Sequence, residues 1–426
     1  MALTKLTQSL IDGTLVTSVN GNTGAVTTGI DLQSSVKTAD FTAVANEGYL
    51  VNTTSSAITV TLPSSPSLGD EVLIIDYAGT FGTNNVTLTS SDNIQGASND
   101  RAVKKNNNSV KLIYSDATKG WLVGSASETD SIGSALPSSF TVDYLVVAGG
   151  GPGGDGNDSG GGGAGGLRTS YGSTSGGGAS AETSLSLSSA TNYTVTVGAG
   201  GSGGSSTNGY DSTFSTITSN GGGAGGDNNT SNYDGLSGGS GGGGDNDAGA
   251  GGSGTAGQGY AGGDGGGTNV EGGGGGGAGA AGASASSGSS AGGAGLAVNI
   301  LSATNAAIES VGEISGSDVY FAGGGGGGGE THPASGNADG GIGGGADGTT
   351  GTTGNNATPN TGGGGGSVDN VGTGGSGGSG IIILRYPNNY TITETTSPAV
   401  LTFNTYTEGS YKVTVFKSGN GTIQFS

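Results

Sequence analysis

Apolar and polar residues alternate through much of the early chain. Ile58, Val60 and Leu62 alternate with threonines, and the same period of two recurs at 86–88 and 110–114. A period of two is typical of β-strands that bury one face. Clusters of turn-forming residues separate these runs. Residues 36–130 are therefore predicted to form a small antiparallel β module without helices.

Two features of this module stand out from the alternation. Val72–Ile75 is a continuous apolar run, which predicts a strand buried on both faces. Trp121 is the only tryptophan of the chain and lies near the end of the module. We interpret it as a core residue rather than as part of a site.

A second region begins where glycine becomes the dominant residue. The apolar run Tyr144–Ala148 opens it, and a second apolar run, Ile381–Leu384, closes it. Both runs predict buried strands, and the simplest interpretation is that they pair with each other. Residues 140–386 would then be a glycine-rich body whose two ends lie close together.

Within this body the glycines occur in runs without the strict Gly-X-Y register of collagen. Consecutive glycines can adopt an extended helix of three residues per turn, which makes no hydrogen bonds within itself. Its N–H and C=O groups must then bond to neighbouring chains, and only residues without side chains approach closely enough. We expect a bundle of polyglycine helices held by many backbone hydrogen bonds. The longest runs are Gly160–Gly163, Gly221–Gly223, Gly241–Gly244, Gly272–Gly277, Gly323–Gly329 and Gly362–Gly366.

The remaining segments are assigned by their composition. Residues 1–35 are polar and without period, which predicts an extended arm that docks on a partner. Residues 387–426 alternate again and predict a β-hairpin or small sheet with Gly419–Gly421 as the turn. The longer inserts of the body are expected to form short strands: Ala179–Val197, Tyr210–Asn220 and Leu296–Ala322. The predicted fold class is all-β with a glycine-rich body and no significant α-helix.

Charge and composition exclude several classes of function. The formal net charge is −21, which repels nucleic acid, and most of it lies in the body, where Arg168 is the only base between residues 149 and 380. There is no cysteine. No apolar run is long enough to span a membrane or to act as a secretory signal. We expect synthesis in a cytoplasm and release by other means, such as lysis.

Residues for catalysis are scarce. His332 is the only histidine and lies in a polar loop. The GxGxxG patterns are expected by chance in such a glycine-rich chain, and no strand-to-helix context follows them. Aspartates of the body could supply oxygen ligands to calcium, but none follows a known calcium-loop spacing, so we interpret them as solvated. We expect no enzyme activity, no cofactor and no metal site.

Three stretches resemble proteins of bacteriophage fibres. Val19–Thr27 is similar to a VNGxTGAVT segment near the start of tail-fibre proteins, and residues 48–121 resemble a small β module of such fibres. Asp143–Gly151, with the closing strand Gly380–Tyr386, is similar to the glycine-rich domain of phage fibres and adhesins. The resemblance implies a virion fibre or tip adhesin, often trimeric, whose polyglycine bundle displays receptor-binding loops.

These observations lead to one expected function and one alternative. We expect a structural virion protein that attaches the particle to a host surface glycan or protein. Its partners would be further copies of itself, as a homotrimer, and other tail or capsid proteins through the N-terminal arm. The alternative is a bacterial surface or matrix filament protein or adhesin. Polar loops between the glycine runs supply the candidate receptor contacts, which are Asn228, Asn232, Tyr233, His332 and Asn356.

Overall fold

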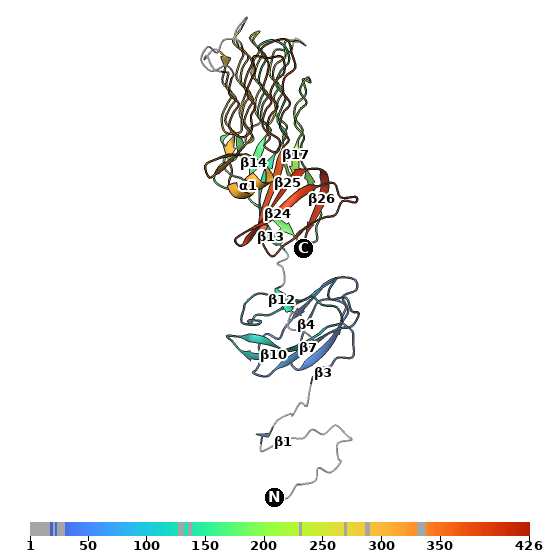
Figure 1. Cartoon of the computed structure of the whole chain (residues 1–426). Coiled ribbons are helices and arrows are strands. Elements are labelled where there is room, and N and C mark those ends of the chain that lie inside the picture. Colours follow the sequence, from blue (N-terminus) through green and yellow to red (C-terminus); the bar gives the residue numbers. More distant parts are fainter. Residues whose placement is uncertain are drawn as a thin grey trace. The chain divides into compact units, whose positions relative to one another are not determined.

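The computed structural model divides the chain into two compact units, Met1–Pro137 and Ser138–Ser426. We call them the β unit and the body unit, and each is described by itself (Figure 1). Strands, turns and extended backbone dominate both, and α1 is the one α-helix among the described residues. The residues that the structure describes are 18–19, 22–23, 30–126, 132–134, 139–229, 232–267, 271–285, 290–329 and 338–426.

The β unit contains two five-stranded sheets with one core between them. The sheet orders are β11-β10-β7-β5-β3 and β12-β9-β8-β6-β4, and a separate short pair joins β1 to β2. Apolar side chains from both sheets form a single buried cluster, which makes the unit a β-sandwich. Its strands are β1 (Ser18–Val19), β2 (Asn22–Thr23), β3 (Asp31–Leu32), β4 (Phe41–Thr42), β5 (Glu47–Val51), β6 (Ile58–Thr61), β7 (Glu71–Asp76), β8 (Val86–Thr89), β9 (Arg101–Val103), β10 (Ser109–Asp116), β11 (Gly120–Ala126) and β12 (Ile132–Ser134).

The prediction of an antiparallel module is corrected by this topology. Strands β3 to β8 alternate between the two sheets along the chain, so neighbours within a sheet are two strands apart in sequence. Successive strands of one sheet therefore run in the same direction, and β3–β5–β7 and β4–β6–β8 are parallel. Only the later pairs, such as β7–β10 and β10–β11, are antiparallel. Alternation in the sequence marks strands but does not say which sheet each strand joins.

The burial of side chains in the β unit tests the predictions made for Val72–Ile75 and for Trp121. Val72 and Ile74 are fully buried, whereas Leu73 and Ile75 are half-buried on the other face of β7. The prediction that Val72–Ile75 is buried on both faces is thus wrong, because β7 packs on the core with one face only. Trp121 is fully buried in the core cluster, as predicted, and packs edge-on against Tyr114.

The body unit combines three sheets with the glycine-rich bundle. Six strands form one sheet in the order β14-β13-β22-β25-β24, with β15 also paired to β13. The other sheets are β18-β17-β16-β26-β23 and β19-β21-β20. The elements are β13 (Ser139–Val147), β14 (Leu167–Thr169), η2 (Gly176–Gly178), β15 (Leu185–Ser188), β16 (Tyr193–Thr196), β17 (Ser212–Phe214), β18 (Ile217–Ser219), β19 (Leu296–Ala297), α1 (Ala303–Glu309), β20 (Glu313–Ser315), β21 (Asp318–Phe321), β22 (Ile381–Pro387), β23 (Ile392–Glu394), β24 (Thr402–Glu408), β25 (Tyr411–Ser418) and β26 (Asn420–Phe425).

The two strands that bracket the glycine-rich region pair with each other. β13 and β22 are antiparallel neighbours, with Val147 opposite Ile381. Their apolar side chains are fully buried, and those of Leu145, Val147, Ile381 and Ile383 belong to the main core cluster of the unit. The glycine-rich chain therefore leaves and re-enters the same sheet at one point, as the sequence predicted.

The C-terminal segment differs from the prediction of a hairpin turning at Gly419–Gly421. β25 pairs with β22 and β24 in the six-stranded sheet, whereas β26 pairs with β16 and β23 in the next sheet. Gly419, with φ at +111°, is the corner where the chain changes sheets. The hairpin of this segment lies earlier, between β24 and β25, because its turn falls at Gly409 with φ at +64°.

A short helix interrupts the insert predicted to contain only strands. α1 begins after Ser302, whose side chain accepts a hydrogen bond from the backbone N–H of Asn305, and ends at Ser310 in the left-handed conformation. Three alanines favour helix in its seven residues. Glu309 ties α1 to the six-stranded sheet through a 2.7 Å ion pair with Lys417 of β25. None of the described helices is long and apolar enough to cross a membrane.

The glycine runs extend from the sheets as side-by-side passes of chain (Figure 1). Their hydrogen bonds repeat every three residues, which is the repeat of a polyglycine helix. In the pass 160–166, Gly160 and Gly163 donate to Gly226 and Gly223, so these two passes are antiparallel. The next two donors, at 161 and 162, bond to two other passes. Each helix thus bonds in several directions, as predicted for a polyglycine bundle.

The pass 160–166, here called the central helix, is surrounded on all sides. Its N–H groups donate to passes 220–226, 273–276 and 362–365, at N···O distances of 2.8–3.1 Å. Its carbonyl groups accept from passes 148–154, 240–243 and 325–328, at 2.8–3.0 Å. Six neighbours therefore satisfy all of its N–H groups and most of its carbonyl groups without any side chain. This is the arrangement in which interchain hydrogen bonds replace apolar burial as the source of stability.

Close contact between passes explains why these residues are glycine. A Cβ atom added to Gly162 would lie 2.3 Å from the carbonyl oxygen of Gly151, and one added to Gly161 would lie 2.2 Å from that of Gly325. Such contacts are with backbone atoms, which cannot rotate away. Side chains appear instead on the outer passes, where Asp, Asn and Ser bond to outward-facing N–H groups. Asp234, for example, accepts from the N–H of Ala250 at 2.8 Å, and Asp264 accepts from that of Gly251 at 2.9 Å.

Candidate functional site

The end of the bundle farther from the sheets, here called the free end, gathers several polar turns. Pass 148–154 leaves the sheet and the central helix returns to it, so the turn 155–158 lies at this end. The N–H of Asn228 donates to the carbonyl of Asp155, and that of Asp158 donates to the carbonyl of Asp369. Turns far apart in sequence thus meet in one place. They include 155–158, the loop whose two sides are 227–229 and 232–234, 245–248 and 369–372.

Side-chain hydrogen bonds hold these turns against one another. Asn246 donates through Nδ2 to Oδ2 of Asp158 at 3.0 Å, and its Oδ1 accepts from Nδ2 of Asn228 at 3.4 Å. Asp155 accepts from the N–H of Gly374 at 2.7 Å. Asp227, only 3% exposed, accepts from the Ser206 hydroxyl at 3.0 Å. The free end is therefore a fixed surface in which carboxylates and amides bond to backbone and to each other.

Three of the predicted receptor contacts lie together at the free end. Asn228 and Asn232 are half-buried and flank the same turn, which is closed by paired backbone bonds between Asp227 and Asn232. Tyr233 is half-buried, and its carbonyl accepts from the N–H of Asp245 at 2.8 Å. The side-chain amide of Asn228 already donates a hydrogen bond to Oδ1 of Asn246.

The other two predicted contacts are placed differently. Asn356 is exposed on a pass that runs toward the turn 358–361, and its Oδ1 accepts from the N–H of Ser376 at 2.8 Å. That turn lies at the sheet end, because Asn360 accepts from Gly312 and Thr361 accepts from Ala322. Asn356 is thus separated from the loop that holds Asn228. His332 lies outside the described residues.

The aspartates of the free end are less solvated than their sequence context predicts. Asp245 is fully buried, and its Oδ2 has no hydrogen-bond partner among the described residues. Burial raises the pKa of Asp245 to about 7, and the nearby carboxylates of Asp247 and Asp227 contribute to the rise. Burial also raises the pKa of Asp155. The interpretation as solvated acids is therefore wrong for Asp245, because the neighbouring passes enclose it.

Within the described part of the chain, no group of three or more His, Cys, Asp or Glu side chains could hold a metal ion. The only base between residues 149 and 380, Arg168, bonds to Glu182 at 2.7 Å next to the sheets. Sequence reasoning missed Val371, which is 71% exposed in a turn of the free end. Its run of glycine and polar neighbours gave no signal that an apolar side chain would be displayed.

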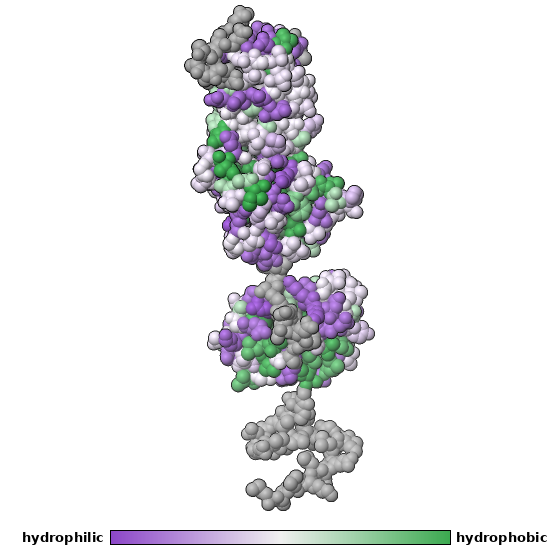
Figure 2. Space-filling model, in the orientation of Figure 1, coloured by the Kyte–Doolittle hydropathy of each residue, from purple (hydrophilic) through white to green (hydrophobic). Residues whose placement is uncertain are grey.

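Hydropathy over the visible face of the body unit differs between the bundle and the sheets. Figure 2 shows mainly near-neutral colours along the bundle, hydrophilic patches at its free end and along its side, and hydrophobic patches around the sheets. The bundle surface thus presents little apolar area on this face.

Comparison with known proteins places the body in a family. No curated protein matches the chain. A family model described as glycine-rich domain matches residues 128–387, which is more than half of the chain. The match begins at residue 128, ahead of β12, and ends with β22, so it covers the bracketing strands as well as the bundle. The chain therefore belongs to the glycine-rich domain family.

Proposed function

We propose that this chain is a structural virion protein of a bacteriophage, a tail fibre or adhesin that attaches the particle to its host cell. The observation that carries the proposal is the free end of the bundle. Four loops from distant parts of the sequence are fixed there on a scaffold of backbone hydrogen bonds. Loops on rigid scaffolds are where proteins concentrate binding function.

The scaffold suits this role for a physical reason. The backbone bonds of the central helix are independent of the side chains at the turns, so turn sequences can vary without loss of the bundle. Proteins that recognise changing cell surfaces require such tolerance. The phage-like segments at Val19–Thr27 and Asp143–Gly151 support a virion origin. In this proposal the arm, residues 1–35, joins three copies to each other and to tail or capsid proteins.

Mass spectrometry of purified particles tests the virion origin. Particles of the phage that encodes the chain, purified from the lysate and freed of unassembled protein, should contain the chain. Its copy number per particle should be divisible by three. Light scattering of the purified full chain should give the mass of a trimer. Particles that lack the chain, while infected cells contain it, would overturn the virion assignment and favour a filament or adhesin of the bacterial surface.

A further inference from the structure

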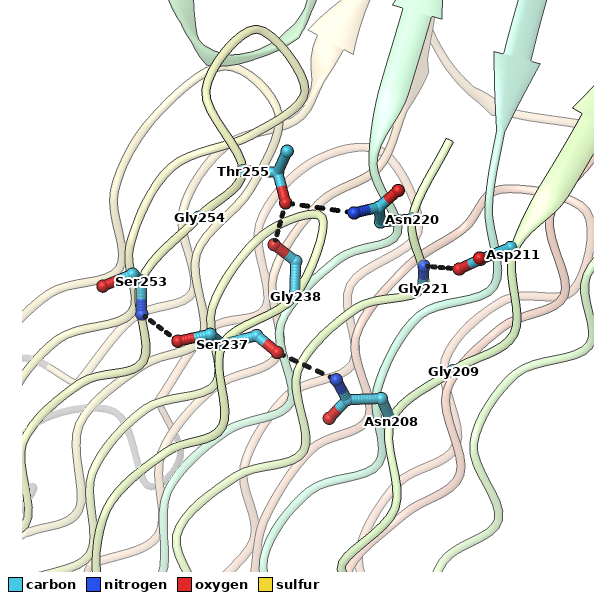
Figure 3. Close-up of a pocket in the computed structure, with 10 residues that line it drawn as sticks. All are labelled: Asn208, Gly209, Asp211, Asn220, Gly221, Ser237, Gly238, Ser253, Gly254 and Thr255. Carbon is cyan, nitrogen blue, oxygen red and sulfur yellow. Dashed lines mark hydrogen bonds between the residues drawn. The ribbon is translucent and has the colours of Figure 1, made fainter. Parts of the chain in front are cut away.

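A polar groove lies on the flank of the bundle near the sheet end, away from the free-end turns. Its cavity volume is about 430 Å³, within the usual range for small-ligand sites. Figure 3 shows that its side chains come from four separate segments and surround a common space. The polar side chains that line it are Asn208, Asp211, Asn220, Ser237, Ser253 and Thr255.

Hydrogen bonds between the segments fix this lining in place. Asn208 donates through Nδ2 to the Ser237 carbonyl at 2.8 Å, and the Ser253 N–H donates to the Ser237 hydroxyl at 3.3 Å. On the other side, Thr255 donates to the carbonyl of Gly238 at 2.8 Å and accepts from Asn220 at 3.4 Å. The lining is therefore preorganised, which lowers the entropic cost of binding a ligand.

Several polar atoms of the lining remain available. Asp211 is exposed and uses Oδ1 to accept from the Gly221 N–H at 2.8 Å, which leaves Oδ2 for a ligand. Asn220 and Ser253 are exposed, and Asn220 bonds through its Nδ2, which leaves its carbonyl oxygen. Together they offer a carboxylate, an amide and a hydroxyl, which are groups that bond well to ligand hydroxyls.

The charge of the groove excludes other ligand classes. Asp211 is the only charged residue of its lining, so phosphate, sulfate and carboxylate ligands find no cationic partner there. Its polar lining is unsuited to an apolar ligand. A neutral ligand rich in hydroxyl groups fits the lining best.

An aromatic side chain adjoins the groove. Tyr210 lies in sequence between Gly209 and Asp211, which both line the groove, and it is 64% exposed. It lines a second hollow of about 530 Å³, together with Val197 and Ala199, and this hollow shares Gly209 and Asp211 with the groove. Aromatic faces pack against the apolar C–H faces of sugar rings. A ligand with two or more rings would reach both spaces.

We propose that the groove and the adjoining hollow bind a neutral oligosaccharide, with one ring packed on Tyr210 and the next bonded to Asp211, Asn220 and Ser253. The inference rests on the proposed attachment function for the source of the glycan, which is the host surface. It adds a second contact region on the flank of the bundle, distinct from the free-end turns.

An array of bacterial surface polysaccharides and their neutral oligosaccharide fragments tests this site, with the purified full chain as the probe. We expect binding to at least one neutral glycan. Tyr210→Ala should weaken it by at least about fivefold, and Ser253→Gln should do the same by filling the groove. Tyr77→Ala, which removes an aromatic side chain that is 58% exposed in the β unit, is the matched control and should bind within about twofold of the parent, the spread of energetically neutral changes. Thermal unfolding of each variant establishes that it is folded.

Each outcome decides the question. Failure to bind any neutral glycan, binding to charged glycans only, or equal binding by the parent, Tyr210→Ala and Ser253→Gln would overturn the inference. None of these results touches the proposed virion function, which depends on the presence of the chain in particles. Conversely, neutral-glycan binding through Tyr210 by a chain absent from particles would leave the site standing and refute the virion assignment.

Discussion

Replacing Gly162 by alanine tests whether backbone contact between passes holds the body together. The added Cβ would lie 2.3 Å from the Gly151 carbonyl oxygen and 2.7 Å from that of Pro152. Neither atom can move without shifting a whole pass. Gly162 also donates to Gly365 at 2.9 Å and accepts from Gly325 at 2.8 Å, so separating the passes weakens bonds on two further sides.

The size of the effect follows from these contacts. Overpacking a tight interior costs about 1–3 kcal/mol, and weakening two buried hydrogen bonds costs about 1 kcal/mol each. Alanine restricts the unfolded chain and returns about 0.4–1 kcal/mol. The expected loss is therefore about 2–4 kcal/mol, which corresponds to a fall in Tm of roughly 3–7 °C for a unit as large as Ser138–Ser426.

Gly351→Ala is the matched control for this experiment. An added Cβ at Gly351 meets only the Thr349 hydroxyl, at 3.4 Å, and the residue does not have a positive φ. Its Tm should stay within about 2 °C of the parent, as for most surface changes. Differential scanning calorimetry of the purified full chain measures both variants. Equal melting of Gly162→Ala and the parent, or an equal fall for both variants, would refute the packing argument.

Three further substitutions probe buried charges of the body. Because the folded state favours neutral Asp245, whose pKa is about 7, the parent should lose stability as pH rises from 4 to 7 and then stay level. Asp245→Asn should therefore have a higher free energy of unfolding than the parent at pH 8, and this difference should narrow toward pH 4. Urea unfolding measures the difference, and a difference that does not change with pH would contradict the prediction. Lys417→Met should destabilise by about 3 kcal/mol because it leaves the buried carboxylate of Glu309 without its cation. Adding Glu309→Gln should recover part of that loss, and no recovery in the same assay would show that Lys417 acts by packing alone.

The same Glu309 has a predictable response to acid. Although burial favours its neutral form, hydrogen bonds from Lys417, Tyr406 and Asn404 lower the pKa of Glu309. The stabilising contribution of the ionised Glu309 carboxylate is therefore fully present at pH values above the usual carboxyl pKa. It is lost as the pH falls through the lowered pKa.

The sequence predicted the types of secondary structure better than it predicted which strands pair. Alternating residues marked the strands of the β unit, but they carry no information on which sheet a strand joins. The parallel pairs β3–β5 and β4–β6 were missed for that reason. The pairing of β13 with β22 was predictable because only these two runs around the body are long and wholly apolar.

The bundle shows the same limit more sharply. Glycine runs predict polyglycine helices. Because glycine has no side chain, however, every run offers a neighbouring pass the same backbone groups. Nothing in their sequence selects pass 160–166 as the central helix. The end at which each loop lies depends on the number of passes before it. The loop of Asn228 was therefore found at the free end and the residues 358–361 at the sheet end, although both loops look alike in sequence. Asn208, Ser237 and Ser253 meet for the same reason, without a sequence signal.

Adsorption of phage particles with altered free ends tests the central claim most directly. One variant replaces 227–234 with a Gly-Ser segment of equal length, and a second replaces 369–372 in the same way. A third, the control, replaces 355–360, whose turn lies at the sheet end. All three particles should contain normal amounts of the chain. The account predicts that the first, the second or both adsorb to host cells at least about tenfold more slowly than the parent, while the control adsorbs normally. Parental adsorption by all three would contradict it and leave the bundle as a spacer.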